Sequence, residues 1–221
     1  MPRLLFSKTG EAVWMSHLDL MRLFQRAFKR AGLELTHTQG YNPRPSVSIA
    51  LPLSLGAESI RELLDFDLDC ANVSNDEIKK RLNDVLVDGV EVLSVYDHGR
   101  KIKELTHLYC AVTMEYDRCL PNEEETETRL EALFARNSLV VEKKSKNGIV
   151  EQDIIPMMRS TIVEQYGPHT IEIRSEICCQ NPAMNPMQIA AAVERYEPDL
   201  KPDFVKFRRI EIYDANGNEF R

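Results

Sequence analysis

The chain has 221 residues, of which 43% are apolar and 29% charged, so it can build a core and is not a disordered chain. Its 28 basic and 35 acidic residues give a net charge of -7, which excludes a general affinity for nucleic acid. No stretch approaches the roughly 18 apolar residues of a membrane span, and the N-terminus lacks a signal-peptide pattern. We therefore expect a cytoplasmic protein without a membrane partner.

The average charge hides an asymmetry along the chain. The first 50 residues hold seven basic and three acidic side chains, a net charge of +4, and the other 171 residues carry -11. A surface that binds anions is therefore expected in the first quarter.

Cofactor chemistry finds little support in the sequence. The five cysteines are odd in number and form no zinc or iron-sulfur spacing, so we interpret all of them as buried thiols: Cys70, Cys110, Cys119, Cys178 and Cys179. The glycines match neither a phosphate loop nor a dinucleotide fingerprint. No metal, cofactor or nucleotide is expected, and the sequence favours a protein that is not an enzyme by itself while leaving that point open.

In the first half, the best-defined element is a helix that Ser16 caps and Gly32 ends, with a capping-box partner at Asp19. Alternating residues predict strands around it, and the acidic side of 62–69 is expected to face water. A second helix should begin after Ser74. The predicted strands are 3–6, 12–15, 33–37, 46–51, 62–69 and 90–96.

The second half repeats this order. Helices are predicted over 121–136 and 186–196, with strands over 108–116, 139–144, 157–164, 170–178 and 204–213. The pattern predicts an α+β fold of two tandem ferredoxin-like β-α-β-β-α-β units with antiparallel sheets, at residues 1–98 and 104–221. One continuous sheet shared by both halves is the main alternative, and a two-sheet sandwich fits less well.

The first helix carries four cations on the side opposite its apolar stripe: Arg22, Arg26, Lys29 and Arg30. No acidic residue follows Asp19 on this helix, so pairing along the helix cannot neutralise them. A simple solvated face is one interpretation. The other is a surface for an anionic partner, either a phosphate backbone or an acidic protein.

The segment 37–45 predicts a stiff loop, because Gly40 permits a positive φ and prolines flank Arg44 on both sides. If 33–37 is the second strand, this loop shares an edge of the sheet with the start of the first helix. Tyr41, Asn42 and Arg44 would then face Ser16, His17 and Asp19 and form an anion site. The alternative is a rigid connection without a binding role.

Two histidines near these features, His17 and His37, are candidate catalytic residues for metal-free cleavage of RNA, with Arg44 to stabilise the phosphorane. Their spacing does not establish such a site. In the last strand, Lys206 and Arg208 share a face and could contribute if the open side of the sheet binds RNA.

Several segments resemble the radical-SAM-linked proteins, a bacterial family of unknown function: Phe6 to Gly10, Ser16 to Leu20 with Arg22 and Arg26, and Gln39 to Pro45. The resemblance is strongest over residues 2–70. That family usually has a histidine or a similar residue where Arg44 stands, which weakens a chemical role for this position. The resemblance implies association with a radical SAM protein and no reaction.

Three hypotheses follow. The first is an accessory protein that binds RNA, or presents a nucleic-acid substrate to a radical SAM enzyme, through the first helix and the 39–45 loop. The second is an interaction module whose basic helix docks on an acidic protein. The third is a metal-independent RNA endonuclease.

Overall fold

A computed structural model describes residues 1–69, 73–145 and 148–221, and Cys70 lies outside the described residues. The fold is α+β. It divides into two compact units, one of residues 1–104 with 220–221 and one of residues 105–219. Each unit is described by itself below.

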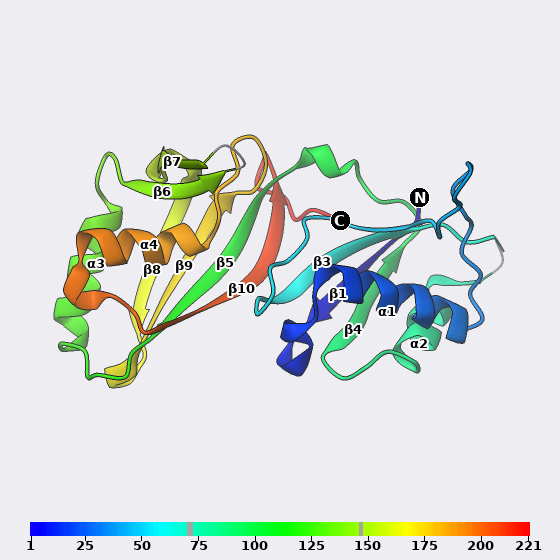
Figure 1. The fold of residues 1–221 in the computed structure, drawn as a ribbon, viewed down its shortest axis with the longest axis horizontal. Helices are drawn as coiled ribbons and strands as arrows, with labels where there is room; N and C mark the ends of the chain where they lie inside the picture. Colours follow the sequence, from blue (N-terminus) through cyan, green and yellow to red (C-terminus); the bar gives the residue numbers. More distant parts are fainter. Residues whose placement is uncertain (70–72, 146–147) are drawn as a thin grey trace. The chain divides into compact units, whose positions relative to one another are not determined.

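The first unit is a four-stranded antiparallel sheet with two helices on one face (Figure 1). Strand β4 pairs with β1, β1 with β3, and β3 with β2. Its elements are β1 (Arg3–Lys8), the 3-10 helix η1 (Gly10–Trp14), α1 (His17–Arg30), β2 (Val47–Ile49), β3 (Glu58–Phe66), α2 (Asn75–Asn83) and β4 (Val90–Tyr96).

Helix α1 has the ends that the sequence predicts. The Ser16 hydroxyl accepts a hydrogen bond from the Asp19 N–H at 3.2 Å, and Gly32 adopts a left-handed φ of +68° after the last turn. Its apolar side packs on the strands, with Phe24 edge-on to Phe6 at 4.8 Å between ring centroids. This burial fixes which side of α1 faces outward.

The stretch before α1 differs from the prediction. Residues 12–15 belong mainly to η1 rather than to a strand, because the chain must turn from β1 into α1 within a few residues. The buried Lys8 supports this turn by donating from Nζ to the Val13 carbonyl at 3.0 Å. Burial lowers the pKa of Lys8, and the charge of Glu62 opposes that shift.

The predicted strand at 33–37 is also wrong. This segment makes two isolated bridges, Leu35 with Leu68 and His37 with Pro45, and no continuous ladder. The second strand of the sheet is β2, which starts at Val47. The predicted strand at 62–69 is shifted, because β3 spans Glu58–Phe66.

The side of this sheet opposite the helices holds a buried arginine. Arg3 is 2% exposed and donates from Nε and Nη2 to the two carboxylate oxygens of Asp65, at 2.6 and 2.9 Å. The guanidinium groups of Arg3 and Arg100 each lie over the Phe220 ring, at 5.5 and 4.9 Å from its centroid. A Cβ on Gly99 would lie 2.4 Å from the Arg3 guanidinium carbon. The expectation that Asp65 faces water is therefore wrong, because this carboxylate neutralises a buried cation.

The second unit has the same strand order, with β10 paired to β5, β5 to β9, and β9 to β8, all antiparallel. Helices α3 and α4 lie on one face of these strands, and β6 with β7 forms a separate hairpin (Figure 1). The elements are β5 (Leu105–Glu115), α3 (Glu123–Phe134), β6 (Val140–Ser145), β7 (Gly148–Asp153), β8 (Met158–Gln165), β9 (Thr170–Cys178), α4 (Met187–Tyr196) and β10 (Phe204–Asp214).

Candidate nucleic-acid interface

The four cations predicted on α1 are all exposed: Arg22, Arg26, Lys29 and Arg30. Arg22 donates from Nη1 to Asp19 at 3.0 Å, and both side chains of this ion pair are more than half exposed, so it is weak. In the part of the chain that the structure describes, neither Arg26 nor Lys29 has an ion-pair partner. Arg30 donates to the Val85 carbonyl at 2.9 Å, which is a neutral acceptor, and it has no ion-pair partner among the described residues.

The start of α1 is closed to an anion by its own side chains. The Ser16 hydroxyl donates to Asp19 Oδ2 at 2.7 Å, and Arg22 binds the other carboxylate oxygen. These two hydrogen bonds, that from Ser16 first, lower the pKa of Asp19 below its ordinary value. A carboxylate already lies beside the free N–H groups, so this end of α1 repels a second negative charge.

The predicted loop at 37–45 is a short hairpin. The Thr38 N–H donates to the Arg44 carbonyl at 2.8 Å, and the Arg44 N–H donates to the Thr38 hydroxyl at 3.0 Å. Gly40 has a φ of +142°, as the sequence suggested. Tyr41 is fully exposed, and Asn42 and Arg44 are exposed as well. The hairpin thus presents an aromatic ring and a guanidinium group to the outside.

The strand register places this hairpin at the other end of α1 from the predicted position. Lys8, at the end of β1, pairs with Ser59 at the start of β3, whereas Val47, at the start of β2, pairs with Phe66 at the end of β3. The chain enters α1 from the Lys8 edge of the sheet and enters β2 from the opposite edge. Since α1 has 14 residues, it is about 21 Å long.

The expected contact of Ser16, His17 and Asp19 with the loop is therefore wrong. It assumed that the loop follows the second strand, but the loop precedes β2. Instead, the hairpin and the C-terminal half of α1 lie toward the same edge of the sheet. We name this group the basic edge and define it by its exposed residues: Arg26, Lys29, Arg30, Tyr41, Asn42 and Arg44.

The two candidate catalytic histidines are separated by the same register. His17 is the first residue of α1, and its Nδ1 is buried without a hydrogen-bond partner. His37 is exposed at the hairpin, where it bridges to Pro45. One imidazole therefore cannot act as the base and the other as the acid on the same phosphate. In addition, no three His, Cys, Asp or Glu side chains among the described residues are grouped to hold a metal ion.

The open face of the second sheet carries cations that are bound to carboxylates. Arg174 contacts both Glu164 and Glu172. Lys206, a predicted contributor to RNA binding, is bonded to Glu115 on the neighbouring strand. Period-two spacing identified the shared face of β10 but could not show which strand would lie beside it.

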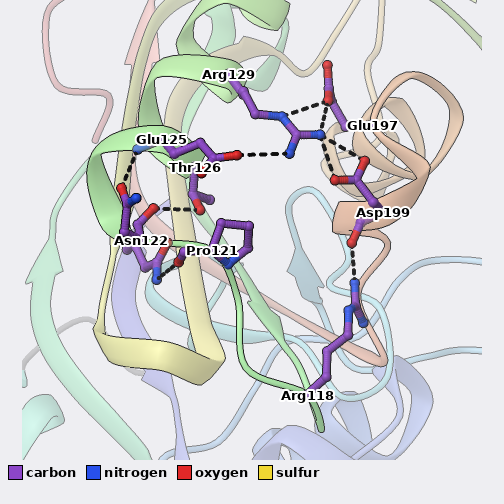
Figure 2. Close-up of polar contacts among 9 residues, drawn as sticks. Arg118, Pro121, Asn122, Glu125, Thr126, Arg129, Glu197 and Asp199 are labelled. Atoms are coloured by element: carbon purple, nitrogen blue, oxygen red, sulfur yellow. Dashed lines mark hydrogen bonds and ion pairs between the residues drawn. The ribbon is translucent and has the colours of Figure 1, made fainter.

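Sequence reasoning also missed a polar cluster between α3 and the end of α4, drawn in Figure 2. Arg129 donates to Glu197 at 2.6 Å and to Asp199 at 2.8 Å, and these hydrogen bonds, that to Glu197 first, raise the pKa of Arg129. Arg118 donates to the carbonyls of Asp199 and Lys201. Because Arg129 of α3 binds two carboxylates that follow α4, this cluster fastens the two helical segments together.

The cysteine prediction fails at one position. Cys110 is buried and Cys178 and Cys179 are partly covered, but Cys119 is exposed, in the turn between β5 and α3. A turn places its side chains outside the two sheet faces, which residue type alone could not reveal.

None of the described helices is long and apolar enough to cross a membrane.

Comparison with known proteins gives a family and a fold. No curated protein matches the chain. Among solved structures, a chain of a Cbf5-Nop10-Gar1 complex matches with a TM-score of 0.50 and 8% identity, over 96% of this chain and 48% of that one. This protein thus spans about half the length of that chain. An unknown protein from Galdieria sulphuraria matches with a TM-score of 0.26 and 11% identity, over 94% and 96% of the two chains. The model of DUF2344, an uncharacterized protein conserved in bacteria, matches residues 2–186, and the chain therefore belongs to this family.

Proposed function

We propose that this protein binds single-stranded RNA through the basic edge. The observation that carries the proposal is that Arg26, Lys29 and Arg44 are exposed without ion-pair partners in the described chain. They lie toward the same edge of the first sheet as the fully exposed Tyr41. Such cations attract a phosphate backbone, and release of its counterions favours binding.

The aromatic residue favours single-stranded RNA over a duplex. A fully exposed tyrosine ring can stack on an unpaired base, which a duplex does not offer. The prolines on both sides of Arg44 restrict the loop, so less conformational entropy is lost when a ligand binds. The basic edge thus combines charge for the backbone with a stacking surface for a base.

We further propose that the chain is a tandem of ferredoxin-like units. The order β4, β1, β3, β2 in the first unit and β10, β5, β9, β8 in the second supports this, because each is a β-α-β-β-α-β unit whose two helices cover one face. The helices leave the basic edge exposed in the first unit.

The proposed partner is a radical SAM protein, to which this chain would present RNA. The motifs around Lys8, Ser16 and Tyr41 support this proposal through their resemblance to radical-SAM-linked proteins. In this role the protein needs no cofactor of its own, because the partner would supply the chemistry.

The test is a titration of labelled single-stranded RNA with two triple variants. Arg26→Gln, Lys29→Gln and Arg44→Gln together should weaken binding by about 100-fold at 0.1 M salt and reduce the slope of log K against log salt by about 2, at roughly 0.7 per lost phosphate contact. The matched control removes the same charge from exposed lysines elsewhere in the first unit: Lys80→Gln, Lys101→Gln and Lys103→Gln. Absent binding in the wild type, or equal losses in the two triples, would reject the proposal.

A protein-interaction module is the second candidate. It is favoured by large apolar side chains exposed at the other end of α1, namely Trp14, Leu18 and Leu55. The Trp14 ring lies against Gly56, next to Leu55. Co-purification with a protein partner that survives nuclease treatment and is lost in Trp14→Ser and Leu18→Ser would favour this function over RNA binding.

Because His17 and His37 lie at opposite ends of α1, an endonuclease would have to use one of these histidines without the other. Incubation with RNA in the presence of a chelator tests it. Discrete fragments that disappear in His17→Ala or in His37→Ala would support cleavage, and unchanged RNA would reject it.

A further inference from the structure

The thiols of the second unit differ in their access to solvent. Cys110 and Cys179 are held in the fold, where burial raises the pKa of each thiol to about 12. Burial also raises the pKa of Cys178, whose sulfur lies 3.4 Å from Nε2 of the covered His107. These three thiols are poor nucleophiles because their thiolates are disfavoured. Cys119 is the exposed thiol among the four described.

Cys119 is paired with an imidazole of defined orientation. Its sulfur lies 4.0 Å from Nε2 of His169. The other ring nitrogen, Nδ1, lies 3.1 Å from the Tyr116 carbonyl and 3.0 Å from the Arg118 carbonyl. A carbonyl can only accept a hydrogen bond, so Nδ1 carries the proton. In a neutral ring, Nε2 is then unprotonated and presents its lone pair toward the sulfur.

The backbone holds both partners in place. The Tyr116 N–H donates to the His169 carbonyl at 3.0 Å, and the Leu120 N–H donates to the Pro168 carbonyl at 2.8 Å. The turn with Cys119 and the turn with His169 are therefore joined on both sides of the pair. Enzymes activate a cysteine with the same arrangement, in which a base lies beside the nucleophile and a further group orients the base.

We propose that Cys119 is a nucleophilic thiol that exchanges with low-molecular-weight disulfides, with His169 as its proton acceptor. This inference is independent of RNA binding, since the pair lies in the second unit and the basic edge in the first. Thiol–disulfide exchange keeps the developing charge on sulfur. It requires a proton acceptor for the thiol and an open approach to the sulfur, and an exposed cysteine beside an oriented imidazole has both.

The exchange is balanced without any further reactant. His169 Nε2 takes the Cys119 proton, and the thiolate attacks one sulfur of the disulfide. The bond between the two disulfide sulfurs breaks as the new bond to Cys119 Sγ forms. The departing thiolate receives the proton from His169 and leaves as a thiol. The products are a mixed disulfide on Cys119 and one free small thiol.

The surroundings favour a cationic disulfide. Arg118, directly before the thiol, is paired with Asp203 at 3.5 Å. The other charged residues close in sequence are acidic, namely Asp117 and, in the first turn of the following helix, Glu123, Glu124 and Glu125. These carboxylates attract ammonium groups and repel carboxylates. Cystamine, a small disulfide with two ammonium groups, is therefore the suitable probe.

The experiment treats the whole protein with cystamine at pH 7 and measures mixed disulfides at each cysteine by peptide mass spectrometry. We expect Cys119 to react at least about 10-fold faster than Cys110, Cys178 and Cys179, because its thiolate is accessible. His169→Asn should slow the reaction at Cys119 by about 10-fold, since an asparagine amide can donate to the same two carbonyls but offers no base.

The matched control is His107→Asn, which changes the other cysteine–histidine pair and should leave the rate at Cys119 unchanged. An equal rate at Cys119 in wild type and His169→Asn would overturn the role of the imidazole and with it the proposal. Reaction at Cys119 no faster than at the covered thiols would overturn it as well. Circular dichroism of each variant, unchanged from wild type, shows that a slower rate does not come from misfolding.

Discussion

The outer face of α1 and the open face of the second sheet both carry arginine and lysine, but they offer these charges differently. On α1, Arg26 and Lys29 have no ion-pair partner in the described chain. On the second sheet, Arg159, Arg174 and Lys206 are each bonded to a glutamate. The first unit has 15 basic and 15 acidic residues, and the second has 13 and 20.

The difference shows that arrangement, more than number, decides whether a cation is available to a ligand. In a sheet, side chains on neighbouring strands lie about 5 Å apart, so opposite charges on one face find each other. On a helix, partners come from positions three or four residues away. Helix α1 offers one such acid, Asp19, and it binds Arg22. We therefore expect a paired and buried cation to contribute to stability, and an exposed cation without a partner to be available to a ligand.

The largest effect is expected where a cation is both paired and buried. Asp65→Ala should destabilise the protein by about 3 kcal/mol, because it leaves the Arg3 guanidinium buried without its carboxylate. Urea unfolding measures this as a lower midpoint. The double replacement Arg3→Met with Asp65→Leu is the control, and it should recover most of the loss since no charge remains buried. If Asp65→Ala is as stable as the wild type, the ion pair between Arg3 and Asp65 does not contribute to stability.

This buried pair also shows how far the sequence could predict the molecule. Capping residues and apolar spacing predicted α1 closely, and alternation predicted β4 and β9, because these signals are local. The pairing of Arg3 with Asp65 depends on two strands 62 residues apart in sequence. The position of the 37–45 loop depended on which segment enters the sheet, and 33–37 and 47–49 are both plausible strands in isolation. Local patterns therefore identified the basic-edge residues but placed the loop at the wrong end of α1.

The second effect concerns the binding of RNA by the basic edge. Tyr41→Ala should weaken binding of single-stranded RNA by about 2 kcal/mol, the usual contribution of one stacked base. The unfolding midpoint should not change, since the ring is fully exposed. Fluorescence anisotropy with a labelled oligonucleotide measures the affinity, and Tyr41→Phe serves as the control because it keeps the ring. Equal affinities of the wild type and Tyr41→Ala would show that Tyr41 does not stack on a base of the bound RNA.

A third change should convert a paired cation into an available one. Glu164→Gln with Glu172→Gln releases Arg174 from both of its carboxylates and should raise the affinity for single-stranded RNA about 10-fold at low salt. The control Glu123→Gln with Glu131→Gln makes the same change in net charge on α3. If both double variants raise the affinity for single-stranded RNA equally, the change in net charge explains the gain. The release of Arg174 from its carboxylates would then have no effect of its own.

The smallest effect concerns the covered histidine of the second unit, His107. Burial, together with the charge of Arg159, lowers the pKa of His107 against the opposing effect of Glu176. Because the folded state disfavours the protonated ring, His107 contributes its full stability above the unfolded pKa of about 6.5, and this contribution falls as the pH drops below that value. The loss is at most about 0.8 kcal/mol at pH 6.0, the limit for a ring that stays neutral when folded. Unfolding midpoints at pH 7.5 and 6.0 should therefore differ less in His107→Gln than in the wild type. An equal difference in His107→Gln and in the wild type would contradict the assignment of this pH dependence to His107.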